Sequence, residues 1–330
     1  MRKIRVAQIG TSRYSHGNDI FKAMKNNPDI FEVVGYAFPE NEREKFHDRI
    51  QCFKGYPEMT VEEILADKTI DAVAIETEEI YLTKYALMAA KAGKHIHMEK
   101  PGGLSLEAFT ELIDTVKKNG TVFHTGYMYR YNPTIKSVID RARAGELGDI
   151  ISVEAQMSGW RGEEQTSWLS NFKGGMMFYL GCHLVDLVLQ IQGMPKAIVP
   201  FNKSTGIYGC DAEDFSFALL EYENGVSFVK TTQAERGGFL RRQLVVTGSR
   251  RKIEIKPLEI TVNYPLQYTE HCEVSDDDWN APGEKFRTEP FDRYNEMMVS
   301  FGKMVAGEKE NPYTPDYELE LYKTILKCCE

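Results

Sequence analysis

Residues 1 to about 125 alternate short apolar runs with segments of helical pattern, and this alternation is the strongest constraint on the fold. The apolar runs are 5–9, 31–38, 71–76, 95–98 and 122–125, and the helical segments are 18–26, 41–49, 61–66, 82–92 and 106–118. Strands that alternate with helices form a parallel sheet covered by helices on both faces. Ligands bind such sheets beyond the carboxyl ends of the strands, so the important residues should directly follow the runs.

The rhythm changes after a helix predicted over 133–144. Strand-like segments then follow one another, at 150–157, 197–203, 215–222, 226–233, 243–247, 252–256 and 259–263. Glu223-Asn224-Gly225 predicts a hairpin in which Asn-Gly supplies positive φ angles, and helices are expected at 183–192 and 291–305. We therefore predict an α/β chain with two domains. Residues 1–125 form the doubly wound parallel sheet, and 126–330 form an α+β domain on a mostly antiparallel, open sheet.

Composition excludes several classes of protein. The chain has 330 residues, 42% hydrophobic and 27% charged, which is typical of a globular protein with two domains. A net charge of −9 argues against nucleic acid as a partner. No apolar run approaches the ~20 residues of a membrane span, and no secretory signal precedes the first strand, so we expect a cytoplasmic protein. The six cysteines have no metal-binding spacing, so no metal site is expected.

The first turn between strand and helix is Gly10-Thr11-Ser12-Arg13-Tyr14-Ser15. A dinucleotide-binding fingerprint would read G-x-G-x-x-G, and serines occupy its second and third glycine positions. Alone, this degraded match favours an ordinary turn. After the second run, Phe38 stands where an acidic residue would bind the adenosine ribose, and Glu40 is the nearest carboxylate. The choice between NAD and NADP is therefore left open.

Met98-Glu99-Lys100-Pro101 directly follows the run 95–98. Pro101 favours extended geometry at Lys100 and permits a cis bond. A lysine fixed beyond the sheet edge could hydrogen-bond a substrate hydroxyl, with its pKa lowered by a neighbouring nicotinamide cation. The alternative is a surface Lys-Pro turn, which is the more common fate of such a tripeptide.

A second candidate lies in the segment 174–186, where glycines flank an apolar strip and a helix begins near His183. His183 and Asp186 are three residues apart on that helix and so share a face. A histidine held by a carboxylate at the mouth of a cleft could act as a general base. A capping or core histidine is an equally good interpretation of this segment alone.

Taken together, these features resemble the glucose-fructose oxidoreductase / inositol dehydrogenase / MocA (Gfo/Idh/MocA) family over essentially the whole chain. The motifs that carry the resemblance are Glu99-Lys100-Pro101 after Ala92-Gly93-Lys94-His95, Gly126-Tyr127-Met128-Tyr129-Arg130-Tyr131-Asn132-Pro133, Gly145-Glu146-Leu147-Gly148-Asp149-Ile150, 174–186, Glu213-Asp214 and Tyr222-Glu223-Asn224-Gly225. The resemblance implies an N-terminal Rossmann-type domain and a C-terminal domain for substrate binding and oligomerisation, with the C-terminal segment a candidate to pack back on the first domain.

The resemblance also implies roles for residues. Lys100 would orient the reacting hydroxyl of a sugar, inositol or related polyol, and His183 would take its proton while hydride passes to NAD or NADP. The family usually has an aspartate four residues before the histidine, and here Tyr179 stands there. The expected cofactor-binding residues are Gly10, Ser12, Arg13, Tyr14, Phe38, Thr77, Glu99 and Lys100. The expected substrate-binding residues are Tyr127, Arg130, Trp160, Arg161 and Trp168.

Departures from the family pattern keep alternatives open. Thr77-Glu78-Glu79 replaces a Thr-Pro motif, and two glutamates beside a pyrophosphate would repel it. The leading hypothesis is an NAD(P)-dependent dehydrogenase or reductase that forms a homodimer or homotetramer. The alternatives are a sugar-binding or regulatory protein that has lost redox function, and an enzyme with tightly held NAD that performs net non-redox chemistry on glycosides.

Overall fold

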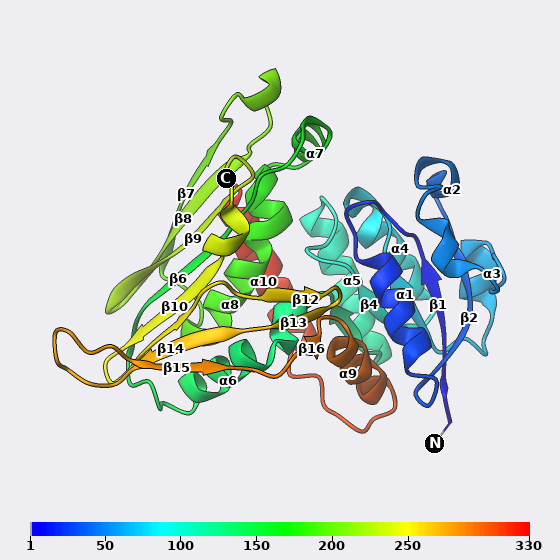
Figure 1. Cartoon of the computed structure of the whole chain (residues 1–330). Helices are drawn as coiled ribbons and strands as arrows, with labels where there is room; N and C mark the ends of the chain where they lie inside the picture. Colours follow the sequence, from blue (N-terminus) through cyan, green and yellow to red (C-terminus); the bar gives the residue numbers. More distant parts are fainter. Residues whose placement is uncertain (1) are drawn as a thin grey trace. The chain divides into compact units, whose positions relative to one another are not determined.

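The structure is a computed structural model in which residues 2–330 are described. The chain divides into two compact units (Figure 1). The first unit contains the residues up to Met128 together with Tyr294–Tyr322, and the second contains Tyr129–Arg293 together with Lys323–Glu330.

The first unit is built on a five-stranded sheet in the order β2-β1-β3-β4-β5. All its strand pairs are parallel, which confirms the predicted α/β fold class. The strands are β1 (Ile4–Ile9), β2 (Phe31–Ala37), β3 (Ala72–Ile75), β4 (His95–Met98) and β5 (Phe123–Thr125). Every residue of β3 is buried, as expected for a strand covered on both faces.

Helices follow the strands of the first unit, and α1 packs against α9 while α4 packs against α5. The helices are α1 (Gly17–Asn26), α2 (Glu42–Lys45), α3 (Val61–Ala66), α4 (Leu82–Lys91), α5 (Leu106–Asn119) and α9 (Asn295–Val305), with short turns η1 (Ile50–Phe53) and η2 (Glu79–Tyr81). The Ser105 hydroxyl caps α5 by accepting from the Ala108 N–H, and Gly120 ends that helix with a φ of 63°.

Two helix predictions are wrong in part. The segment predicted as a helix over 41–49 forms only the four-residue α2, because Arg49 turns back and donates to carbonyls of the loop after β1. In the segment predicted over 291–305, Phe291–Asp292 forms strand β16 and the helix begins at Asn295. In both places tertiary contacts override a helical pattern.

The second unit is built on an eight-stranded sheet in the order β15-β14-β11-β10-β6-β9-β8-β7. Its pairs are antiparallel except β6–β9, which confirms the mostly antiparallel sheet. The strands are β6 (Ile150–Ser158), β7 (Ala197–Lys203), β8 (Phe215–Tyr222), β9 (Gly225–Thr232), β10 (Gln243–Gly248), β11 (Lys252–Ile255), β14 (Glu270–Val274) and β15 (Glu284–Arg287). A three-stranded sheet contains β12 (Ile260–Asn263), β13 (Leu266–Tyr268) and β16.

Helix α8 (Cys182–Gln192) packs on β6 and beside α6 (Pro133–Arg143). The short elements of this unit are α7 (Glu163–Trp168), η4 (Leu169–Asn171), the π-helical turn η5 (Met177–Gly181), η6 (Ile207–Gly209) and η7 (Gly238–Arg241). The short turn η3 (Met128–Tyr131) crosses from the first unit to the second. Helix α10 (Pro315–Cys328) begins in the first unit and ends in the second.

The β8–β9 hairpin lies where it was predicted, with Tyr222 paired to Gly225 across the turn. The predicted positive φ angles are wrong, because neither Asn224 nor Gly225 has one. Gly225 is required instead because the neighbouring strand leaves no room for a side chain. A Cβ at Gly225 would lie 1.9 Å from the carbonyl oxygen of Ile151.

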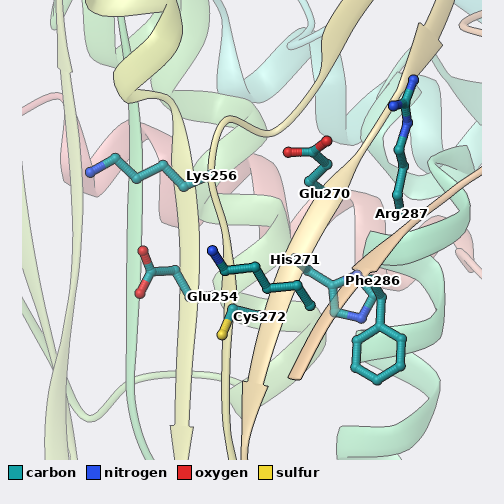
Figure 2. Close-up of a pocket in the computed structure, with 8 residues that line it drawn as sticks. Glu254, Lys256, Glu270, His271, Cys272, Phe286 and Arg287 are labelled. Atoms are coloured by element: carbon teal, nitrogen blue, oxygen red, sulfur yellow. The ribbon is translucent and has the colours of Figure 1, made fainter. Parts of the chain in front are cut away.

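One face of the eight-stranded sheet carries large apolar side chains on β7, β8 and β9. Val199 and Phe201 on β7 are 46% and 45% exposed, and Phe217 on β8 stacks on Phe228 of β9. Register places these four side chains on the same face. The far half of the face, on β11, β14 and β15, is charged and forms a shallow hollow of about 390 Å³ lined by Glu254, Lys256, Glu270, His271, Cys272, Lys285, Phe286 and Arg287 (Figure 2).

Candidate active site

The residues predicted to bind a cofactor lie at one edge of the five-stranded sheet. Gly10 follows β1, Phe38 follows β2, Thr77 comes shortly after β3, and Glu99 and Lys100 follow β4. All five strands are parallel, so these residues share the carboxyl edge that binds ligands in such sheets.

The loop between β1 and α1 is tightly built. Gly10 has a φ of 91°, and a Cβ there would lie 2.5 Å from the backbone nitrogen of Thr77, so only glycine lets the two loops approach this closely. The Ser12 N–H donates to the Glu76 carbonyl (2.9 Å), and the Ser15 hydroxyl accepts from the Gly17 N–H (3.1 Å) at the start of α1. The serines in the glycine positions therefore order this loop.

Arg49 holds the same loop through its carbonyl groups. Its guanidinium donates to the carbonyl oxygens of Thr11 (3.1 Å), Arg13 (3.3 Å) and Ser15 (3.3 Å). The Arg13 guanidinium makes a two-pronged ion pair with Asp48. The Arg49 guanidinium thus lies close to the N-terminus of α1, where an anion is also favoured by the helix dipole.

Carboxylates beyond Phe38 tie the loops together. Glu42 is fully buried and accepts from the backbone N–H groups of Thr11 (2.7 Å) and Glu78 (3.1 Å). Burial outweighs these hydrogen bonds and raises the pKa of Glu42 to about 8. Glu40 accepts from Lys84 (2.6 Å) and the Tyr85 hydroxyl (2.7 Å), so its carboxylate is already engaged.

The two glutamates after Thr77 differ in environment, and this weakens the predicted repulsion of a pyrophosphate. Glu78 pairs with Lys45 at 2.7 Å. Glu79 is 1% exposed, and burial raises its pKa to about 8 although Lys100 lies near enough to lower it. Glu79 is therefore mostly protonated at neutral pH.

Lys100 is 1% exposed, which excludes the surface-turn interpretation. Its ammonium lies 3.6 Å from the Glu99 carboxylate, and the Lys100–Pro101 bond is cis. The other oxygen of Glu99 is 3.1 Å from Nδ1 of His16, at the start of α1. Burial raises the pKa of Glu99, but His16 and Lys100 together outweigh it and hold that pKa below its usual value.

A dinucleotide fits this edge. Within residues 2–330, both carboxyl oxygens of Glu79 and Oε1 of Glu99 are buried without a hydrogen-bond partner. Buried polar groups without a partner are rare in folded proteins and call for one. Ribose hydroxyls can donate to Glu99 and both donate to and accept from Glu79, and Arg13, Arg49 and the start of α1 would balance a pyrophosphate.

The second unit places His183 in the first turn of α8, directly after the π-helical turn η5. Irregular turns of this kind are frequent at functional sites. His183 is 1% exposed, and the Tyr129 ring packs edge-on against it with centroids 5.5 Å apart. The Tyr129 hydroxyl donates to Glu259 (2.9 Å), and burial raises the pKa of Tyr129 to about 12.

Asp186 accepts two hydrogen bonds from the buried Arg130 guanidinium, at 3.0 and 2.8 Å, and a third from Gln190 at 2.8 Å. The resulting ion pair anchors α8 from the segment after β5. The prediction that Asp186 orients the His183 ring stays a prediction.

Tyr179 lies in the middle of η5, and Trp168 packs edge-on against its ring with centroids 5.0 Å apart. Trp160 and Arg161 follow β6 in the same unit. Lys100 and Tyr127 belong to the first unit, and His183, Tyr179 and Arg130 to the second. The convergence of Lys100 and His183 on one crevice stays a prediction.

Sequence reasoning missed Glu42, Arg49 and Glu259. Glu42 and Arg49 fell within a segment predicted only as a helix, and Glu259 began a predicted strand. The only available signal was the position of Glu42 four residues beyond Phe38, close to the expected acidic position.

No helix within residues 2–330 is long and apolar enough to cross a membrane. In the same residues, no group of three or more His, Cys, Asp or Glu side chains is arranged to hold a metal ion.

Comparison with known proteins identifies the family of both halves of the chain. Residues 4–127 match the model of an oxidoreductase family with an NAD-binding Rossmann fold, and residues 135–254 match the GFO/IDH/MocA C-terminal domain. An uncharacterised oxidoreductase from Rhizobium meliloti is 24% identical over 271 residues, which cover 80% of this chain and 78% of the relative.

A scyllo-inositol 2-dehydrogenase (NADP⁺) from Bacillus subtilis is 24% identical over 228 residues, which cover 67% of this chain and 61% of that protein. A 2,7-anhydro-N-acetylneuraminate hydratase from Escherichia coli is 24% identical over 207 residues, 61% of this chain. The chain spans 54% of the hydratase, just over half its length.

Among solved structures, an aldose-aldose oxidoreductase from Caulobacter crescentus has a TM-score of 0.78 at 17% identity and covers 99% of this chain and 98% of its own. A 3-ketoreductase from Actinomadura kijaniata also has a TM-score of 0.78 at 17% identity, with 98% and 96% covered. These structures share the fold. With both family models matched along most of its length, the chain belongs to the Gfo/Idh/MocA family of oxidoreductases, whose N-terminal domain is an NAD-binding Rossmann fold.

Proposed function

We propose that this protein transfers hydride between NAD or NADP and a hydroxyl or ketone group of a sugar, inositol or related polyol. The observation that carries the proposal is the buried Lys100 beside the Glu99 and Glu79 carboxyls, at the carboxyl edge of a family-typical NAD-binding sheet. Relatives named as inositol and glucoside dehydrogenases support the substrate class.

NAD(P), when bound, supplies the hydride acceptor or donor. The residues that would hold the cofactor are Gly10, Ser12, Arg13, Tyr14, Phe38, Thr77, Glu99 and Lys100. The Lys100 ammonium hydrogen-bonds the reacting oxygen, and the His183 imidazole takes the hydroxyl proton as the C–H hydrogen leaves as hydride. Tyr179, one turn before His183, assists by a hydrogen bond to the same oxygen. The substrate side of the site is lined by Tyr127, Arg130, Trp160, Arg161 and Trp168.

The test replaces His183 and Lys100 separately by alanine. Each change should lower kcat/KM with a turned-over polyol by about 10²- to 10⁴-fold, because a positioned acid–base group contributes that much. Steady-state kinetics with NAD and with NADP over a panel of sugars and inositols gives the measurement.

The control variants are His47→Ala and Lys91→Ala, because both side chains are exposed and lie outside the expected site. They should retain wild-type activity, and circular dichroism should show that all four variants are folded. Full activity of His183→Ala or Lys100→Ala would refute the assigned roles.

One observation favours the second candidate, a sugar-binding protein without redox function. The Thr11 N–H, in the loop expected to face the cofactor, is already occupied by Glu42. Calorimetry with both dinucleotides separates the candidates. Micromolar binding of either one eliminates the non-redox candidate, whereas sugar binding without dinucleotide binding would establish it.

We also propose that a second copy of the chain covers the apolar half of the eight-stranded sheet. Support comes from Val199, Phe201, Phe217 and Phe228, which form a contiguous apolar area on one face. Contiguous exposed apolar areas of this kind mark interaction surfaces. A symmetric dimer would pair the face with itself.

A further inference from the structure

Three loops of the second unit meet where β6 and β9 end (Figure 1). Trp160, two residues beyond β6, forms a β-bridge with Ala234, and the Arg161 N–H donates to the Gln233 carbonyl (3.3 Å). The Tyr208 hydroxyl, from the loop between β7 and β8, donates to the Arg161 carbonyl (3.2 Å). These contacts fix the three loops against one another.

Side chains from the three loops form an exposed platform, which we define as Trp160, Tyr208 and Arg236. The Arg236 guanidinium lies 3.9 Å from the centroid of the Trp160 ring, and the Tyr208 ring lies 6.4 Å from it. Trp160 and Tyr208 nevertheless remain 37% and 41% exposed. Tyr208 also has a φ of 59°, a left-handed conformation that aromatic residues rarely adopt.

Two arginines at the platform lack the partners that arginines usually have. Within residues 2–330, the Arg161 and Arg236 side chains make no hydrogen bond or ion pair, although the chain has 49 acidic and 40 basic residues. Guanidinium groups offer planar arrays of donors to acceptor oxygens. The platform therefore presents an aromatic surface beside unsatisfied donors.

Helix α7 links the platform to Tyr179 of the candidate active site in the same unit. Trp168, on α7 a few residues beyond Trp160, packs on Tyr179. Gln233 donates to Thr166, which fixes α7, and α7 lies beside η6, which carries Tyr208. Helix α7 thus contacts Tyr179 through Trp168 and lies beside the turn that carries Tyr208.

We propose that the platform is a subsite for a second sugar ring, so that the substrate is a glycoside rather than a free monosaccharide or inositol. The second ring stacks its C–H face on Trp160 and Tyr208 and directs oxygen acceptors to Arg161 and Arg236. Aromatic side chains with one apolar face and nearby donors suit such amphipathic rings. This inference rests on the proposed function.

The first test compares parent compounds with their glycosides: glucose with maltose, galactose with lactose, and myo-inositol with galactinol. For a turned-over pair, the glycoside should exceed its parent in kcat/KM by about tenfold, the effect of one good aromatic contact. Tyr208→Ala, at a platform residue outside the expected active site, should abolish this advantage and leave kcat/KM for the parent within about twofold. Trp279→Ala, at a side chain 96% exposed, is the matched control and should change neither value.

The second test does not require turnover. Titration of the wild-type protein with maltose, lactose and galactinol should change tryptophan fluorescence. The response should persist in Trp279→Phe and be lost in Trp160→Phe.

The outcomes separate the two proposals. Absence of turnover for every compound with both dinucleotides refutes the proposed redox function, and the fluorescence titration then decides the subsite alone. An equal loss on parent and glycoside in Tyr208→Ala, no advantage of any glycoside, or no fluorescence response would overturn the subsite.

Discussion

At the scale of single residues, Glu79 combines full burial with a missing hydrogen-bond partner, and this makes stability depend on pH. Burial raises its pKa from 4.5 to about 8 in the folded protein. Protonation of Glu79 therefore contributes fully to the free energy of unfolding below pH 4.5. This contribution is lost as the pH rises to about 8, because Glu79 ionises at lower pH in the unfolded chain than in the folded protein.

Glu79→Gln removes this titration. The variant should gain stability relative to wild type as pH rises from 5 to 8, by about 2–4 kcal/mol at the upper end, with no further gain above pH 9. Urea unfolding at a series of pH values measures the difference. Glu62→Gln, at an exposed position on α3, is the control, and a constant difference between wild type and Glu79→Gln would contradict the shifted pKa.

The sequence allowed the ends of the strands to be predicted, and with them Gly10, Thr77, Glu99 and Lys100, because these residues directly follow or lie just beyond short apolar runs. The roles of Glu42 and Arg49 could not be predicted. Both depend on where a four-residue helix ends and on which backbone groups of a distant loop it meets, and neither is a local property of the sequence.

At the scale of elements, the parallel pairing of β6 with β9 brings the start of β9 against β6. The carbonyl of Ile151 occupies the space where Gly225 would carry a side chain. Gly225→Ala should therefore lower the free energy of unfolding by about 1–3 kcal/mol, since backbone must move to accommodate the methyl group.

The control is Gly159→Ala, because nothing lies within 4 Å of a Cβ built there. Its effect should stay within about 0.5 kcal/mol in the same denaturant titration. Equal effects of the two substitutions would show that the close approach of Ile151 does not constrain position 225.

The strands of the first unit were predictable because buried strands are short apolar runs. Strands β13 to β16 and helices α7 and α10 were not predicted. Strand β15 is exposed throughout, and Trp168 is the one apolar residue of α7, so neither carries the apolar periodicity on which such predictions depend.

At the scale of the whole molecule, the apolar face of the eight-stranded sheet predicts self-association. Phe201→Asp should shift the protein from a dimer or larger assembly towards monomers, because a carboxylate would be buried without a partner at the interface. Light scattering coupled to size-exclusion chromatography measures the change. Met194→Asp, at a residue 53% exposed outside that face, should leave the mass unchanged. A wild-type monomer would disprove the proposal.

Helix α10 starts among residues of the first unit and finishes among those of the second, and Tyr294–Tyr322 return to the first unit after the second has been completed. Neither unit is thus encoded by one uninterrupted stretch of the gene. A fragment that stops at Met128 would lack α9 and the start of α10, so dissecting this protein into working halves requires joining distant segments with a linker rather than a single cut.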